Sequence, residues 1–273
     1  SEYLDAFPPL GRIYLPTASY FEMMEWALPT DSGKKLEKII EDLKRQNKFE
    51  EYSQFFKGGF FRNFLVKYPE ANNLHKKMLW VSQRLSTLRK GKSFLGEKER
   101  ERRLREAMIE LYKGQCNCAY WHGVFGGLYL NYLRDAVYEH LIKAENLMEK
   151  YARGKDDYVE ITVTDFDKDG QDEVILSNNL LNLYFSPACG GALFELDYKP
   201  KNFNLINSLA RREEVYHHKI RKAAEQAAEG QPPGATSIHD LVKVKEKGLE
   251  KALVYDWHRR ISLLDHFLGE NAN

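Results

Sequence analysis

The chain has 273 residues, of which 43% are apolar and 30% are charged, so it can build the core of one large or two ordinary domains. Its 41 basic and 40 acidic side chains leave a net charge of +1, which excludes bulk attraction to nucleic acids or anionic lipids. No apolar run approaches the roughly 20 residues of a membrane span, and the N-terminus lacks a signal-peptide pattern. With only three cysteines, these features predict a soluble, cytoplasmic protein without nucleic-acid or membrane partners.

The N-terminal residues 1–12 contain two prolines and no helical pattern, and residues 12–15 are typical of a short β-strand. Residues 19–26 predict a short helix that places Glu22 and Glu25 on one face. Glycoside cleavage uses two carboxyl groups, one as nucleophile or base and one as acid. On one short helix, however, such a pair more commonly forms a solvated face or contacts an arginine, and we favour that interpretation.

Amphipathic stripes predict further helices up to residue 151. Apolar residues at helical spacing mark residues 33–43 and 70–90, and a stripe from Leu133 to Met148 predicts a helix of about 22 residues. Residues 97–113 predict another helix, whose charge-dense first half is a solvated face with i, i+4 pairs. Residues 33–151 are therefore predicted to form a bundle of about four helices. The phenylalanine-rich residues 49–64 favour a buried aromatic cluster over a sugar-stacking platform.

A dense aromatic and polar run precedes the last of these helices. Tyr120, Trp121 and His122 are followed by glycines at 123, 126 and 127, which permit a bend and a close backbone approach. We expect the three side chains to face outward together, an arrangement that suits a polyhydroxylated ligand, with Asn117 as an additional donor and acceptor. Cys116, Cys118 and His122 resemble three metal ligands, but no fourth ligand follows at a usual spacing, so packed thiols are favoured.

The composition changes after residue 152 from helical to β. Alternating runs predict strands at 158–164, 172–177, 181–186 and 190–198, as in an antiparallel meander or sandwich. Residues 211–229 favour a helix within a mobile excursion that covers 211–250, and residues 255–268 are expected to return as a strand. The predicted fold class is α+β, with an N-terminal helical bundle followed by an antiparallel β-sandwich-type domain that is incomplete.

An acidic turn joins the first two predicted strands. Asp165, Asp167, Asp169 and Gly170 resemble the first half of a calcium-binding loop. The loop's glutamate at position twelve and its flanking helices are absent, and aspartate with glycine also makes an ordinary hairpin turn. The plain turn is favoured, with Ca2+ as the alternative. The adjacent His217 and His218 have poor geometry for one metal.

Two strings in the chain resemble signature regions of one enzyme family. GQCNCAYWHGVFGGLYLNYLRDAVYEHLIKAENLMEK at residues 114–150 and PTASYFEMMEWALP at residues 16–29 are similar to segments of glycoside hydrolase family 57, in its 4-α-glucanotransferases and α-amylases. They occur in the order and at about the spacing typical of that family. One departure is Cys118, where many relatives carry aspartate, so a polar sugar contact there is not expected.

This resemblance implies an enzyme that acts on α-1,4-glucans with retention of configuration. The family's catalytic glutamate and aspartate lie on a barrel upstream of the 16–29 segment, and neither has a counterpart here. The chain would then comprise the end of the barrel (1–30), the helical bundle (31–152) and the start of the β-sandwich (153–273). The implied contacts to an α-glucan or maltooligosaccharide are Trp121, His122, Tyr120 and Asn117, supported by Tyr20, Glu22, Glu25 and Trp26.

On this interpretation no cofactor is required, and the isolated chain has no turnover. The alternative is a non-catalytic carbohydrate-binding or domain-packing module that docks on the absent barrel. A helical bundle with an unrelated β domain is a third interpretation. The sequence leaves transfer and hydrolysis, and also the oligomeric state, open.

Overall fold

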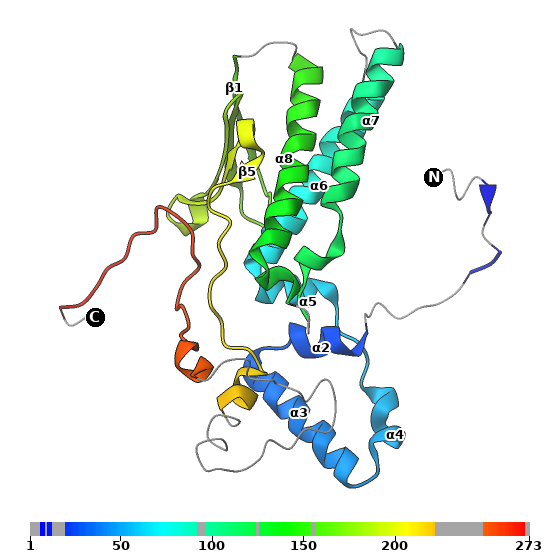
Figure 1. Ribbon diagram of the computed structural model, residues 1–273, viewed down its shortest axis with the longest axis vertical. Helices are drawn as coiled ribbons and strands as arrows, with labels where there is room; N and C mark the ends of the chain where they lie inside the picture. The colour runs from blue at the N-terminus through cyan, green and yellow to red at the C-terminus, as the bar shows by residue number, and fades with distance from the viewer. Residues whose placement is uncertain are drawn as a thin grey trace. The chain divides into compact units, whose positions relative to one another are not determined.

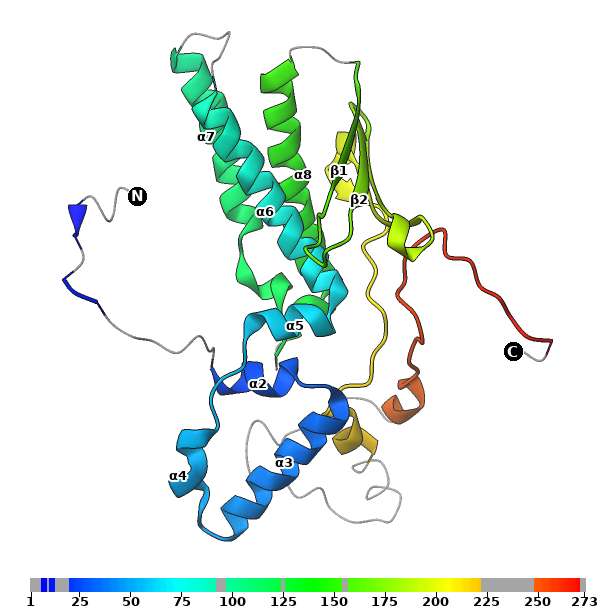
Figure 2. The same cartoon turned by 180° about the vertical axis from the view of Figure 1, so that it is seen from behind.

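A computed structural model describes residues 6–8, 10–12, 20–91, 97–123, 126–153, 157–221 and 248–270. The chain divides into two compact units, Ser1–Lys67 and Tyr68–Asn273, and each is described by itself. Figures 1 and 2 show their elements from two sides. None of the helices in these ranges has the length and apolar content needed to cross a membrane.

The first unit is helical. It contains α2 (Phe21–Ala27), α3 (Thr30–Arg45), α4 (Phe49–Tyr52), η1 (Ser53–Phe55) and α5 (Phe61–Lys67), so the helices predicted at 19–26 and 33–43 are confirmed. The aromatic segment is only partly buried, because Phe64 is inaccessible whereas Phe55 is 70% exposed. The predicted strand at 12–15 lies, apart from Arg12, outside the described residues.

Three long helices begin the second unit. They are α6 (Pro69–Lys90), α7 (Glu97–Gly114) and α8 (Asn131–Arg153), and they lie side by side in both views (Figures 1 and 2). The predicted stripe of α8 is confirmed, since Val137, Leu141, Ala144 and Met148 are buried. The amphipathic spacing identified these helices because each buries one face.

Five antiparallel strands follow in a simple meander. The order is β1 (Val159–Thr164), β2 (Glu173–Asn178), β3 (Leu181–Ser186), β4 (Ala192–Tyr198) and β5 (Phe203–Asn204). Ile161 pairs with Leu176, Leu176 with Leu183, and Leu183 with Leu196, and a bulge follows Tyr184. The sheet is open, and the predicted α+β class with four of its strands is confirmed.

One face of the sheet packs against α6 and α8. Phe166, Ile175, Tyr184 and Phe194 form a buried cluster there, against which Trp80 of α6 packs. The opposite face of β1 is apolar and open, with Val159, Ile161 and Val163 exposed by 78%, 65% and 61%. Helices and sheet therefore share one core within this unit.

The predicted strand at 255–268 is wrong for most of its length. The segment is irregular apart from one bridge, in which Leu193 and Ser262 exchange two backbone hydrogen bonds of 2.9 Å. Leu263 has a φ of 60°, which interrupts an extended conformation directly after the bridge. Of the helix predicted at 211–229, residues 217–221 are helical, and residues 222–229 lie outside the described part.

Candidate functional site

The aromatic loop comprises residues 115–130, described to Gly123 and again from Gly126, and it links α7 to α8. It contains two short 3-10 turns, η2 (Asn117–Tyr120) and η3 (Gly127–Tyr129). The backbone N–H of Leu128 donates to the Trp121 carbonyl at 2.9 Å, which fastens the second half of the loop to the first. The loop is thus folded back on itself at the N-terminus of α8.

Gly127 makes this close approach possible. Its φ is +43°, and a Cβ at this position would overlap the Trp121 carbonyl oxygen and come within 2.7 Å of the Cys118 carbonyl oxygen. Both neighbours are backbone atoms, so neither can move aside as the end of a flexible side chain could. The close approach predicted from the glycines is confirmed here.

His122 is held inside the unit. Its side chain is 1% exposed, and its ring centroid lies 4.8 Å from that of Tyr68 and 5.0 Å from that of Tyr129. Its Nε2 lies 3.9 Å from Oε1 of Glu214, which is itself buried. The imidazole therefore packs between the rings of Tyr68 and Tyr129 on the buried side of the loop.

Glu214 is the acceptor at the centre of this cluster. The Tyr68 hydroxyl donates to its Oε1 at 2.5 Å, and the Tyr129 hydroxyl donates to the same oxygen. Burial, and then the nearby Glu214 carboxylate, raise the pKa of the Tyr129 phenol, so it keeps the proton that it donates. No sequence pattern singles out Glu214, because it lies in a helix-prone, polar stretch whose partners are 146 and 85 positions away.

The outward presentation expected for the three residues is wrong for two of them. Tyr120 is 5% exposed, donates to the Gly114 carbonyl and contacts the His75 ring edge-on at 6.1 Å. His122 is buried as described. Trp121 is half-buried, and Asn117 is exposed. Trp121 and Asn117 are thus the members of this set that reach the surface of the unit.

The second predicted set lies in the first compact unit. Tyr20 precedes α2 and is 45% exposed. Glu22, Glu25 and Trp26 are half-buried on α2, and Lys67 donates to the Trp26 carbonyl at 3.2 Å. Each set is thus built within its own unit.

The acidic turn uses a different third carboxylate from the one predicted. Asp165 and Asp167 lie near Glu173, with ligand atoms within 4.8 Å of one another, whereas Asp169 instead accepts from the backbone N–H of Gln171 at 2.7 Å. The Glu173 carboxylate accepts from the backbone N–H of Phe166 at 2.8 Å. Glu173, the first residue of β2, is 1% exposed and also accepts from the backbone N–H of Asp167 at 3.3 Å.

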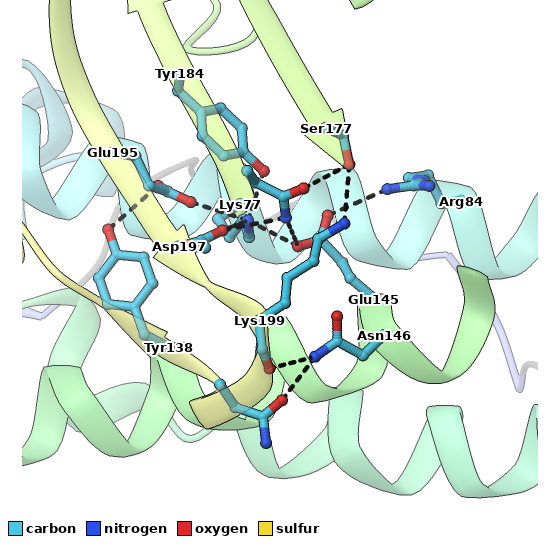
Figure 3. A network of polar contacts seen from close by, with 12 residues as sticks. Lys77, Arg84, Tyr138, Glu145, Asn146, Ser177, Tyr184, Glu195, Asp197 and Lys199 are labelled. Carbon is cyan, nitrogen blue, oxygen red and sulfur yellow. Dashed lines mark hydrogen bonds and ion pairs between the residues drawn. The ribbon is translucent and has the colours of Figure 1, made fainter. Parts of the chain in front are cut away.

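A buried charge network joins the helices to the sheet (Figure 3). We define it as Lys77 and Arg84 of α6, Glu145 and Glu149 of α8, and Glu195, Asp197 and Lys199 of the sheet region. The Lys77 ammonium is inaccessible and lies 2.7 Å from Glu145, 2.9 Å from Glu195 and 2.7 Å from Asp197. Lys199 lies 2.7 Å from Glu149. The network was not predicted, because its members are typical of solvated charges in the sequence.

The network has one carboxylate more than it has cations. Four carboxylates (Glu145, Glu149, Glu195, Asp197) face three cations (Lys77, Arg84, Lys199), an excess of one negative charge if all are ionised. Burial raises the pKa of Glu195 to about 8, against the opposing effect of Lys77. A protonated Glu195 removes the excess charge.

This protonation predicts a pH-dependent stability. The folded chain retains the Glu195 proton up to about pH 8, whereas the unfolded chain releases it near its ordinary pKa of 4.5. The stabilisation is therefore complete below pH 4.5 and lost as the pH rises through about 8, by about 3 kcal/mol between pH 6 and 9. Urea unfolding at both pH values measures the slope, and Glu195→Gln, which stays neutral, is expected to reduce it. An equal slope in both proteins would show that Glu195 is ionised when folded.

Comparisons with known proteins place these features in a family. Residues 59–148 match the family model "Alpha-amylase/4-alpha-glucanotransferase, middle domain", and residues 165–273 match "Alpha-amylase/4-alpha-glucanotransferase, C-terminal". The first match covers α6, α7 and the aromatic loop, and the second covers strands β2 to β5.

Individual relatives agree with this assignment. The chain is 46% identical over 263 residues to "Alpha-amylase 1" of Dictyoglomus thermophilum and 43% identical over 268 residues to "4-alpha-glucanotransferase" of Thermococcus kodakarensis. These matches cover 96% and 98% of the chain but 35% and 37% of the relatives. The crystal structure of 4-alpha-glucanotransferase from Thermococcus litoralis matches with a TM-score of 0.68 and 38% identity, over 94% of this chain and 35% of that one.

Fold and matches together define a class of multidomain proteins in which a helical middle domain precedes a β-rich C-terminal domain. The chain belongs to the alpha-amylase/4-alpha-glucanotransferase family. It spans about a third of the length of the curated relatives that it matches.

Proposed function

We propose that the chain is the middle and C-terminal portion of a retaining enzyme of glycoside hydrolase family 57 that acts on α-1,4-glucans. The observation that carries this proposal is the aromatic loop, in which buried His122 and Tyr120 support a half-buried Trp121 beside an exposed Asn117. A rigid indole provides an apolar face for a sugar ring, and an amide donates to and accepts from hydroxyl groups. The loop would bind substrate for chemistry performed elsewhere.

The contacts of the buried carboxylates indicate that the catalytic groups belong to another part of the enzyme. Retaining cleavage requires one carboxyl group as nucleophile and another as acid and base, about 5 Å apart. The buried carboxylates described here are engaged in structure: Glu145, Glu195 and Asp197 by Lys77, and Glu214 by two tyrosines. The nucleophile and the acid/base would come from the barrel, which is the proposed partner of this chain.

The proposed organisation keeps three segments: the barrel end at 1–30, the helical bundle at 31–152 and the start of a β-sandwich at 153–273. The open apolar face at Val159, Ile161 and Val163 supports the last of these. Such a face favours a covering layer, as between the two sheets of a sandwich. The same face favours the alternative function, a domain-packing module.

We also propose a cytoplasmic location. Cys116, Cys118 and Cys189 are free and exposed, so the packing expected for the first two thiols is wrong. Free thiols are usual in a reducing compartment.

Calorimetric titration with maltoheptaose tests the proposed sugar contact. Trp121→Ala removes the indole, and we expect the dissociation constant to rise roughly 30-fold, which corresponds to about 2 kcal/mol. Trp257→Ala is the matched control, because Trp257 is 77% exposed in the same unit and lies outside the aromatic loop. It should leave binding unchanged.

Two outcomes would contradict the proposal. Equal losses in Trp121→Ala and Trp257→Ala would show that the aromatic loop does not bind the glucan. Glucose release from maltotriose by the pure chain would show that it carries its own catalytic groups. Absence of heat in the unmodified chain at millimolar maltoheptaose would favour the domain-packing function.

The acidic turn gives a separate prediction about Ca2+. We infer that Asp165, Asp167 and Glu173 serve the turn through backbone hydrogen bonds, such as those from Phe166 and Asp169. Adding about 5 mM Ca2+ should therefore change Tm by less than about 1 °C. A tight Ca2+ site would instead raise Tm, because a ligand that binds only the folded chain stabilises it by mass action. A larger rise that Asp167→Asn abolishes would instead assign a calcium site to this turn.

A further inference from the structure

We propose that a second pocket, separate from the aromatic loop, binds the ring of a neutral polyhydroxylated ligand such as a single sugar residue. The pocket has a volume of about 290 Å3 and is lined from α6, α8 and strands β1 to β3. This volume is just below the usual range for small-molecule sites, roughly 300–1,000 Å3, and suits a single ring. The six residues that carry the argument are Trp80, Arg84, Glu145, Thr162, Ser177 and Asn182.

An aromatic side chain forms one wall. Trp80 contacts Phe166 of the core edge-on, with ring centroids 6.3 Å apart, and the Arg84 guanidinium lies 5.8 Å from the Trp80 ring. These contacts fix the indole without burying it completely. A fixed, partly open indole offers the apolar face on which the C–H groups of a sugar ring pack.

Polar atoms with unused hydrogen-bonding capacity line the same space. Among the residues that the structure describes, neither the Trp80 N–H nor the Thr162 hydroxyl has a hydrogen-bond partner. The Thr162 hydroxyl can both donate and accept, whereas the Trp80 N–H only donates. The pocket thus offers donors and acceptors, which is the combination that ligand hydroxyl groups require.

The floor of the pocket is rigid. Glu145 is inaccessible, Asn182 is 2% exposed and Ser177 is 9% exposed. The Ser177 hydroxyl donates to the Asn182 side-chain oxygen at 2.6 Å and accepts from Lys199 at 2.9 Å. Figure 3 shows Glu145, Ser177 and Arg84 on one side of the charge network. A prearranged floor lowers the entropic cost of binding.

The charges favour a neutral ligand over an anion. Arg84 lies 3.3 Å from Glu145 and 3.6 Å from Glu149, and Glu145 is further paired with Lys77. A phosphate would have to break these ion pairs and would approach Glu160, which also lines the pocket, whereas a hydroxylated ring can add to them. The pocket geometry alone carries this inference, and the proposed function enters only in the choice of a glucose ring as the probe.

The test follows the indole N–H signals of the 15N-labelled chain by NMR. The chain has four tryptophans, so the Trp80 signal is assigned as the one lost in Trp80→Phe. Methyl α-glucoside, titrated to about 50 mM, covers dissociation constants near 1 mM. We expect a saturable shift of the Trp80 signal that sorbitol, which has no ring, does not reproduce.

Two variants locate the response. Thr162→Phe fills the pocket and should abolish the shift, whereas Val163→Phe, on the adjacent outward-facing position of β1, should leave it unchanged. Thermal melting establishes that both variants fold. Trp121→Ala should not alter the Trp80 response, so failure of this site and failure of the aromatic loop are distinguishable.

The proposal is overturned if Trp80 shows no saturable shift in the unmodified chain. It is equally overturned if a folded Thr162→Phe responds as the unmodified chain does, or if sorbitol produces the same shift.

Discussion

Replacement of Lys77 by methionine is expected to lower the free energy of unfolding by about 3–5 kcal/mol, the usual loss when one partner of a buried ion pair is removed. The ammonium lies within 2.9 Å of Glu145, Glu195 and Asp197, and all four side chains are inaccessible to solvent. Without it, the carboxylates of Glu145 and Asp197 must take up protons or draw in water. Urea denaturation of the two proteins at pH 7 measures the difference.

The neighbouring lysine provides a matched control. Lys76 on the same helix is only half-buried and donates to Asn72 at 2.9 Å, so Lys76→Met should cost less than about 1 kcal/mol. The Lys77→Met loss should also shrink at pH 5, where the carboxylates are more readily protonated. Similar losses in the two variants would mean that the network contributes little to stability.

Replacement of Gly127 by alanine should both destabilise the chain and weaken its binding of maltoheptaose. The added Cβ meets the backbone of Trp121 and Cys118 and also requires a φ near +43°. We expect a loss of about 2–4 kcal/mol, because strain and a clash with immobile backbone act together. Since the same backbone positions Trp121, calorimetry should show weaker binding at temperatures where the variant remains folded.

A second glycine separates strain from the clash. Gly190 has a φ of +70°, and a Cβ added there would have no atom within 4 Å, so Gly190→Ala should cost only the left-handed strain of about 1 kcal/mol. It should leave maltoheptaose binding intact. If Gly127→Ala behaves like Gly190→Ala in both measurements, the loop is not fixed by the close approach.

The helices and strands were predictable because each buries one face. The stripe of Val137, Leu141, Ala144 and Met148 and the alternation of β1 follow from periodicity alone. The strand predicted at 255–268 failed because apolar content there is not matched by a partner strand, and Ser262 makes a single bridge to Leu193. Composition does not specify which strands are available for pairing.

Only those features of the site that depend on residues close together in the sequence were predictable. The glycines indicated a close approach, which Gly127 makes. The Lys77 network was hidden because charged residues are usually at the surface, and Lys77 meets Asp197 across 120 positions. Glu214, likewise, becomes a site residue only through Tyr68 and Tyr129. A charged side chain can be buried only where the fold brings a partner to it, and the spacing of residues along one helix does not indicate such partners.

The central claim is that Trp121, supported by buried His122, forms one wall of a glucan-binding cleft. A crystal structure of the chain with maltoheptaose tests it most directly. We predict a glucose ring stacked on the Trp121 indole with a hydroxyl group within hydrogen-bonding distance of Asn117. A bound oligosaccharide that leaves Trp121 uncontacted, or a Trp121 covered by other parts of the chain, would contradict this claim.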